Sequence, residues 1–235
     1  MKISFMTLGC PNWDLDTICR RGREYGFEGV DFRGYLDEID ITRLPLFTTQ
    51  AAQTKRQLND AGLEVSGISS SIEVCDPSLR QANIDEAKRT IDVSKRLGSR
   101  NVRMFGGGQL EGSSHEELAQ IGLDCVREIL ALDGASDLHW LFETHDNWIK
   151  AADCTLLLNR IDNPAFGALW DMGHTARVGG ETPQQSYAAI GPRVGYTHVK
   201  DAVFDPAKGE WHYVLPGEGQ LPLAEAIGLL KAHGY

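Results

Sequence analysis

The sequence predicts an α/β fold, a barrel of eight parallel strands and outer helices whose eighth strand is missing from the chain. Short β-rich runs alternate with amphipathic segments along the chain, which is the pattern of parallel strands joined by right-handed crossovers. Three consecutive runs end in acidic or histidine residues, as expected where the C-terminal strand ends of a barrel gather on one face. No Gly-x-Gly-x-x-Gly follows the first strand, which disfavours a dinucleotide-binding open sheet.

Seven strand and helix units follow one another. The predicted strands are short, apolar and bounded by turn residues, at 3–6, 29–32, 63–68, 101–105, 140–143, 166–171 and 194–198. The predicted helices have apolar residues at helical spacing, at 14–25, 49–61, 84–97, 115–132, 151–160, 183–190 and 223–233. Asp14 is suited to cap the first helix, and glycine ends three helices, at Gly26, Gly62 and Gly98.

The chain ends at Ala-His-Gly-Tyr, where an eighth strand is expected to begin. We therefore expect residues 1–235 to form a single barrel domain that is incomplete at its C-terminus. The edges of the first and seventh strands would then lack a neighbour, which is an aggregation liability unless another segment covers them.

Composition and charge exclude several classes of partner. The net charge of −10 and the pI near 5.1 oppose binding to nucleic-acid backbones and to anionic membrane surfaces. We find neither a signal peptide nor an apolar run of membrane-spanning length. The five scattered cysteines form no Cys-x-x-Cys pair and indicate reduced thiols, so the predicted location is the cytoplasm.

Three strand ends carry residues that are suited to bind a divalent metal. Glu143 follows Leu-Phe, Asp171 follows Leu-Trp and His198 follows Tyr-Thr, each at the end of a predicted strand. Because strand ends converge in a barrel, these side chains are predicted to meet. Mixed oxygen and nitrogen ligands suit manganese or cobalt and are tolerated by zinc and magnesium. A solvated loop residue or a helix cap is the alternative for any one of them.

Other side chains near the same strand ends are candidates for binding substrate. His174 follows Asp171 by three residues, where it contacts substrate, binds a second metal or caps the next helix. The remaining candidates are His145, Lys200, Asp201, Arg103 and Trp13. Lys200 and Asp201 are placed to orient His198 or to bind substrate hydroxyls. Ion pairing is the alternative for Arg103 and packing of a loop is the alternative for Trp13.

The strand-end motifs resemble the xylose-isomerase-like TIM-barrel superfamily, in its sugar phosphate isomerase/epimerase branch, over nearly the whole chain. That branch includes ketose 3-epimerases and inosose isomerases and dehydratases. The motifs that carry the resemblance are Gly-Val-Asp-Phe-Arg (29–33), Val-Arg-Met-Phe-Gly-Gly (102–107), Phe-Glu-Thr-His-Asp (142–146), Trp-Asp-Met-Gly-His (170–174), His-Val-Lys-Asp (198–201) and Leu-Pro-Gly-Glu-Gly (215–219).

The resemblance implies a metal-dependent isomerase or epimerase of a ketose or keto-polyol that works through an enediolate. Glu143, Asp171 and His198 match three metal ligands of the family, with manganese, cobalt or magnesium as the usual metal, and Glu143 would also be the acid/base group. His145 and His174 match positions near substrate oxygens. The fourth ligand of the family, a glutamate on the eighth strand, has no counterpart in this sequence. The resemblance also implies a small-molecule sugar or polyol substrate and allows pairing into a homo-oligomer through the helices.

Three other functions are alternatives for this sequence. An inosose-type dehydratase would share the metal site and the first step. A sugar-binding relative without catalysis would retain the pocket, and the lack of the eighth-strand glutamate favours it. An apurinic-site endonuclease requires additional histidines where this chain has Ser69-Ser70-Ser71 and Phe105-Gly106-Gly107, and the acidic composition opposes it.

Overall fold

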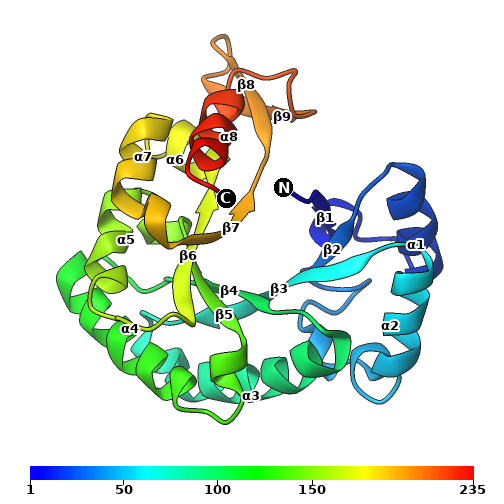
Figure 1. The fold of residues 1–235 in the computed structure, drawn as a ribbon. Helices are drawn as coiled ribbons and strands as arrows, with labels where there is room; N and C mark the ends of the chain where they lie inside the picture. The colour runs from blue at the N-terminus through cyan, green and yellow to red at the C-terminus, as the bar shows by residue number, and fades with distance from the viewer. The chain divides into compact units, whose positions relative to one another are not determined.

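A computed structural model describes residues 1–235 (Figure 1). The chain forms two compact units. Unit 1 comprises residues 1–73, 78–104 and 124–140, and unit 2 comprises residues 74–77, 105–123 and 141–235. Parallel strands neighbour one another in chain order from β1 to β7, which is the strand order of a (β/α) barrel, and no eighth parallel strand is present. No helix combines the length and the hydropathy that crossing a bilayer requires.

Unit 1 alternates strands and helices from the N-terminus. Its elements are β1 (Ser4–Met6), α1 (Leu15–Glu24), β2 (Gly29–Phe32), α2 (Ala51–Asp60), β3 (Glu64–Glu73), α3 (Arg80–Leu97) and most of β4 (Asn101–Phe105). β2 pairs in parallel with both β1 and β3. The predicted cap of α1 is confirmed, because the Asp14 side chain accepts a hydrogen bond of 2.8 Å from the backbone N–H of Thr17.

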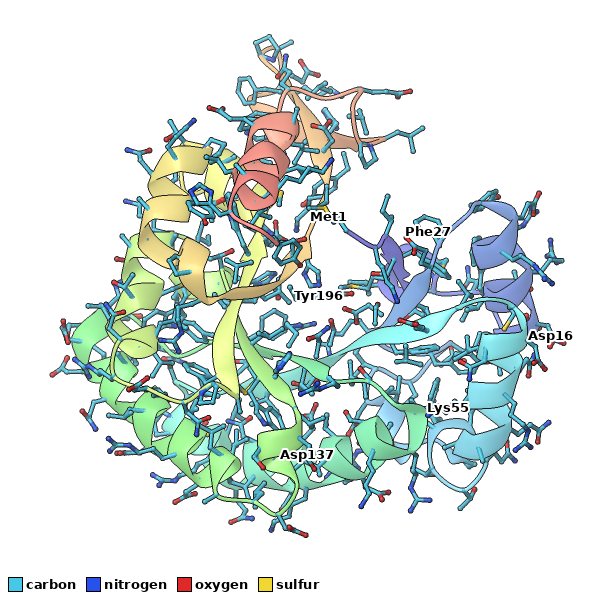
Figure 2. The ribbon with its side chains drawn as sticks, in the orientation of Figure 1. Met1, Asp16, Phe27, Lys55, Asp137 and Tyr196 are labelled. Carbon is cyan, nitrogen blue, oxygen red and sulfur yellow. The ribbon has the colours of Figure 1, made fainter.

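The core of unit 1 forms where β2 meets its helices. Val30 and Phe32 of β2 are fully buried, and Phe32 packs edge-on against Phe47 with ring centroids 4.8 Å apart. Phe27, labelled in Figure 2, packs at the border of this core against Phe5. Burial of these aromatic and aliphatic side chains is the main favourable contribution to folding here.

Unit 2 contains the three strand ends that carry the predicted metal ligands. Its strands are β5 (His139–Glu143, from Leu141 on), β6 (Phe166–Asp171), β7 (Val194–His198), β8 (Asp201–Asp205) and β9 (Glu210–Val214). Its helices are α5 (Ala151–Leu158), α6 (Met172–Arg177), α7 (Pro183–Ile190) and α8 (Leu223–Ala232), and α4 (His115–Leu130) begins in it. β6 and β7 pair in parallel, with Asp171 opposite His198.

All seven predicted strands and seven predicted helices are present, but three features differ from the prediction. β3 continues through Ser69-Ser70-Ser71 to Glu73, because the Ser70 hydroxyl donates to the Arg103 carbonyl and lets a polar side chain be buried. The six-residue helix α6 begins directly after β6 and was not predicted. β8 and β9 form an antiparallel hairpin where the sequence analysis expected no strands.

Candidate metal centre

Glu143, Asp171 and His198 lie together at the ends of β5, β6 and β7 in unit 2. One ligand atom of each lies within 4.8 Å of those of the other two. The register of β6 and β7 sets Asp171 directly opposite His198, and Tyr196, labelled in Figure 2, precedes His198 by two positions on the same strand. The convergence that the sequence predicted for these three residues is therefore present in the structure.

Two carboxylates of this cluster are buried, and each has a basic partner. Glu143 is 3% exposed and Asp171 is 1% exposed. Nδ1 of His198 lies 2.7 Å from Oε1 of Glu143, and Nζ of Lys200 lies 2.7 Å from Oδ2 of Asp171. Buried carboxylates are costly without positive charge beside them, so this cluster favours cationic groups, of which Lys200 is one.

Asp171 has a second contact, which explains the unpredicted helix. Its Oδ1 accepts a hydrogen bond of 2.8 Å from the backbone N–H of His174, so Asp171 is the N-cap of α6. A cap at the last residue of β6 starts the helix without a connecting loop. The same turn brings the His174 ring back toward the carboxylate, with Nδ1 3.3 Å from Oδ2 of Asp171.

His174 contacts both Asp171 and Lys200, which also contact each other. Nζ of Lys200 lies 3.1 Å from Nε2 of His174. The pKa of His174 is lowered to about 4, mainly by burial; the Asp171 carboxylate opposes this shift and the Lys200 charge adds to it. The ring is therefore neutral near pH 7, and its Nε2 accepts a hydrogen bond from the Lys200 ammonium group.

His145 extends this cluster on the side of β5. Its ring packs edge-on against His174, with centroids 4.4 Å apart, and lies tilted against Phe105, with centroids 4.6 Å apart. Its Nδ1 lies 2.5 Å from Oδ1 of Asp146. Asp146 was not among the predicted site residues, and its φ of 50° lies in the left-handed region, which aspartate adopts more readily than most residues other than glycine.

Asp201 has contacts of a different kind. It is 2% exposed, and both carboxylate oxygens accept backbone hydrogen bonds, from Ala202, Gly217, Gly219 and Leu221. Burial raises the pKa of this carboxyl, but the four donors outweigh burial and leave the pKa below its ordinary value. These contacts hold a turn, and we therefore propose no substrate contact for Asp201.

Comparison with known proteins identifies the family. The family model described as xylose isomerase-like TIM barrel matches residues 19–235. The chain belongs to this family. The family named from the sequence motifs is thus confirmed, and so is the barrel fold.

The relatives include several enzymes. A 3-dehydroshikimate dehydratase from Pseudomonas putida is 24% identical over 89% of this chain, and the chain spans only 33% of that protein. The structure of the probable 3-DHS dehydratase AsbF from Bacillus anthracis has a TM-score of 0.81 at 20% identity, covering 100% of this chain and 90% of that one. The IOLI protein with a bound zinc atom has the same TM-score at 17% identity, covering 100% and 86%.

The donor set of this family member fits a divalent cation. Two carboxylates and one imidazole at the ends of neighbouring strands provide hard oxygen ligands with one nitrogen. The short approach of their ligand atoms and the burial of both acids favour a bound cation over solvated loop residues.

Arg103 and Trp13, two further predicted substrate ligands, belong to unit 1 and are described with it. Arg103 is 4% exposed on β4. Trp13 packs edge-on against Phe5, with ring centroids 6.2 Å apart, at the border of the unit 1 core. This contact is the packing alternative considered for Trp13. Roles of Arg103 and Trp13 in substrate binding stay predictions.

Proposed function

We propose that this chain is a divalent-metal-dependent isomerase or epimerase of a ketose or keto-polyol that works through an enediolate. The observation that carries the proposal is the buried cluster of Glu143, Asp171 and His198, whose ligand atoms lie within 4.8 Å of one another. Family membership supports it, because relatives of the same fold include a 3-keto-D-glucoside 4-epimerase from E. coli and a D-tagatose 3-epimerase-like protein.

Glu143, Asp171 and His198 would hold the metal, for which manganese is our first candidate, with cobalt, magnesium and zinc as the others. When bound, the cation supplies a Lewis acid that stabilises negative charge on the oxygen of the substrate carbonyl. We assign proton removal from the neighbouring carbon to the Glu143 carboxylate. Its contact with His198 fixes its orientation, which a general base requires.

His174, Lys200 and His145 are our candidates for binding the substrate oxygens. Lys200 brings a positive charge that is only partly buried, with 29% of its side chain exposed. The neutral His174 ring contacts both this ammonium group and Asp171, and a neutral imidazole has one nitrogen that donates a hydrogen bond and one that accepts. Such groups orient hydroxyls next to the carbonyl.

A dehydratase is the second candidate function. The curated relative in Pseudomonas putida favours it, since that protein is a 3-dehydroshikimate dehydratase and matches 89% of this chain. Both reactions begin with removal of a proton beside a carbonyl. They differ in the next step, because a dehydratase expels a hydroxyl group from the adjacent carbon whereas an isomerase or epimerase returns a proton.

The test is deuterium uptake from solvent into a panel of ketoses, keto-polyols and 3-dehydroshikimate. The purified chain is loaded with manganese, and substrates are followed by NMR and mass spectrometry. We expect deuterium at the carbon beside the carbonyl, with an isomer or epimer as product, and Glu143→Gln should reduce the rate by at least about a hundredfold. Loss of water from the substrate would instead identify the dehydratase.

The matched control is Glu64→Gln, which removes an exposed carboxylate at the start of β3. It should leave deuterium uptake unchanged. Uptake that persists at the wild-type rate in Glu143→Gln would exclude Glu143 as the base.

A further inference from the structure

We propose that Asp201 is a positioning residue that fixes His198 for the metal. Its buried carboxylate ties the chain just after β7 to a turn at 217–221, and so sets where the last residue of β7 lies. This inference rests on the proposed metal-dependent function. It assigns Asp201 no contact with substrate or metal.

The Asp201 carboxylate is enclosed by backbone N–H groups. Oδ2 accepts from Gly217 at 2.9 Å and from Gly219 at 3.0 Å. Oδ1 accepts from Ala202 at 2.9 Å and from Leu221 at 3.2 Å. Charge-assisted bonds of this kind are the stronger class of protein hydrogen bonds, and burial of the acceptor makes their loss costly.

The turn at 217–221 is shaped around that carboxylate. Gly217 has a φ of 95°, a conformation that favours glycine. A Cβ atom added at Gly219 would overlap Oδ1 of Asp201, so only glycine lets the turn approach this closely. The Gln220 backbone N–H donates to the Ala202 carbonyl at 2.9 Å, and the Gln220 side chain accepts from Phe204 at 2.9 Å. The turn is thus fastened to β8 at several points.

β8, to which the turn is bound, begins at Asp201, three residues after His198. Lys200, between them, lies against Asp171 at 2.7 Å, and a Cβ at Gly173 would come within 2.6 Å of the Lys200 stem. The chain from β7 to β8 is therefore held at Lys200 by the cluster and at Asp201 by the turn. His198 comes directly before these two contacts, and its Nδ1 lies 2.7 Å from Oε1 of Glu143.

This geometry makes the imidazole position depend on Asp201. A metal ligand must be held within about 0.5 Å of its productive position by the residues around it. Groups that hold ligands in place change metal affinity by about 10- to 100-fold when they are replaced. Asp201 acts on His198 through the backbone. We therefore expect its replacement to weaken metal binding by about tenfold, at the lower limit of that range.

The test uses Asp201→Asn, which keeps the shape of the side chain and removes its charge. A second variant, Gly219→Ala, disturbs the same contact from the turn and leaves the carboxylate in place. Asp205→Asn is the matched control, because Asp205 ends the same strand and caps the hairpin turn through the Ala207 N–H. Three quantities are measured: amide exchange at 217–221, the ring ¹⁵N signals of His198 at fixed pH, and manganese affinity by calorimetry.

We expect faster amide exchange at 217–221, shifted His198 ring signals and about tenfold weaker manganese binding in both Asp201→Asn and Gly219→Ala. Asp205→Asn should match the wild type in all three. Faster exchange with unchanged ring signals and affinity would overturn the inference, because Asp201 would then hold only the turn.

Failure of the proposed function gives a different result. A wild-type chain that binds no manganese, cobalt, magnesium or zinc contradicts the metal site itself. The ring signals then decide the inference alone: a shift in both variants supports positioning of His198 by Asp201, and unchanged signals overturn it.

Discussion

Individual carboxylates in this chain stay charged because specific donors surround them, and Asp40 in unit 1 is an instance. It accepts hydrogen bonds of 2.9 Å each from Arg43 and Arg89, and it also accepts from the Thr42 backbone. Burial raises the pKa of Asp40, but these donors outweigh burial and leave the pKa below its ordinary value. Asp40 therefore links its 3-10 turn to α3 mainly as an anion.

Replacing Asp40 should have a pH-dependent effect. A lowered pKa in the folded state stabilises the fold at every pH above the unfolded value, near 4, and this contribution is lost as pH falls through the folded value. We expect Asp40→Asn to reduce the free energy of unfolding by about 1 to 3 kcal/mol at pH 7 and by less at pH 3. Urea unfolding at both pH values measures this, with the exposed Asp60→Asn as control. An equal loss at both pH values would contradict the assignment.

Strand-end position was enough to predict that Glu143, Asp171 and His198 converge, because the C-terminal ends of parallel strands lie at one edge of the sheet. The partners of these residues could not be predicted in the same way. The contact of His145 with Asp146 occurs where Asp146 has a φ of 50°, a conformation that the sequence pattern does not predict. The bonds of Asp201 depend on a turn sixteen or more residues further along the chain.

Elements were predicted well where glycine or a capping side chain marks their ends. The helix α7 has the clearest such signal, because the Thr182 hydroxyl accepts from the Gln185 N–H and the Gln185 side chain accepts from the Thr182 N–H. α6 was missed because its cap is the last residue of a strand, so no loop residues separate the two elements. The β8–β9 hairpin was missed because each strand is only five residues long and neither alternates buried with exposed residues: Asp201 and Ala202 are both buried, and no residue of β9 is.

The capping box of α7 should contribute measurably to stability. Thr182→Ala removes the acceptor for the Gln185 N–H and leaves that group unsatisfied, so we expect a loss of about 1 kcal/mol in the free energy of unfolding. Thr182→Asp keeps a side-chain acceptor at the same position and should retain most of the stability. Chemical denaturation of the three proteins makes the comparison. Equal stability of the Thr182→Ala and wild-type chains would show that the capping box contributes nothing to the free energy of unfolding.

At the scale of the whole molecule, the three candidate ligands belong to one compact unit, although they come from three strands spread over 56 positions of the sequence from Glu143 to His198. Length and the alternation of elements predicted the barrel class, and family membership confirms it. The formal net charge of −10 also favours cations in general, so a specific site must be distinguished from diffuse binding.

Metal should therefore stabilise the folded chain in a ligand-dependent way. A cation that binds only the folded state adds about 2.7 kcal/mol at a concentration one hundred times its dissociation constant. We expect manganese to raise the unfolding temperature of the wild type and to slow amide exchange around 141–145, 166–174 and 194–201. Asp171→Asn should lose both effects at moderate salt, because diffuse attraction to surface acids is screened there whereas coordination by buried ligands persists. The same rise in unfolding temperature in Asp171→Asn would mean that manganese stabilises the chain through its surface charge and that the buried cluster is not its site.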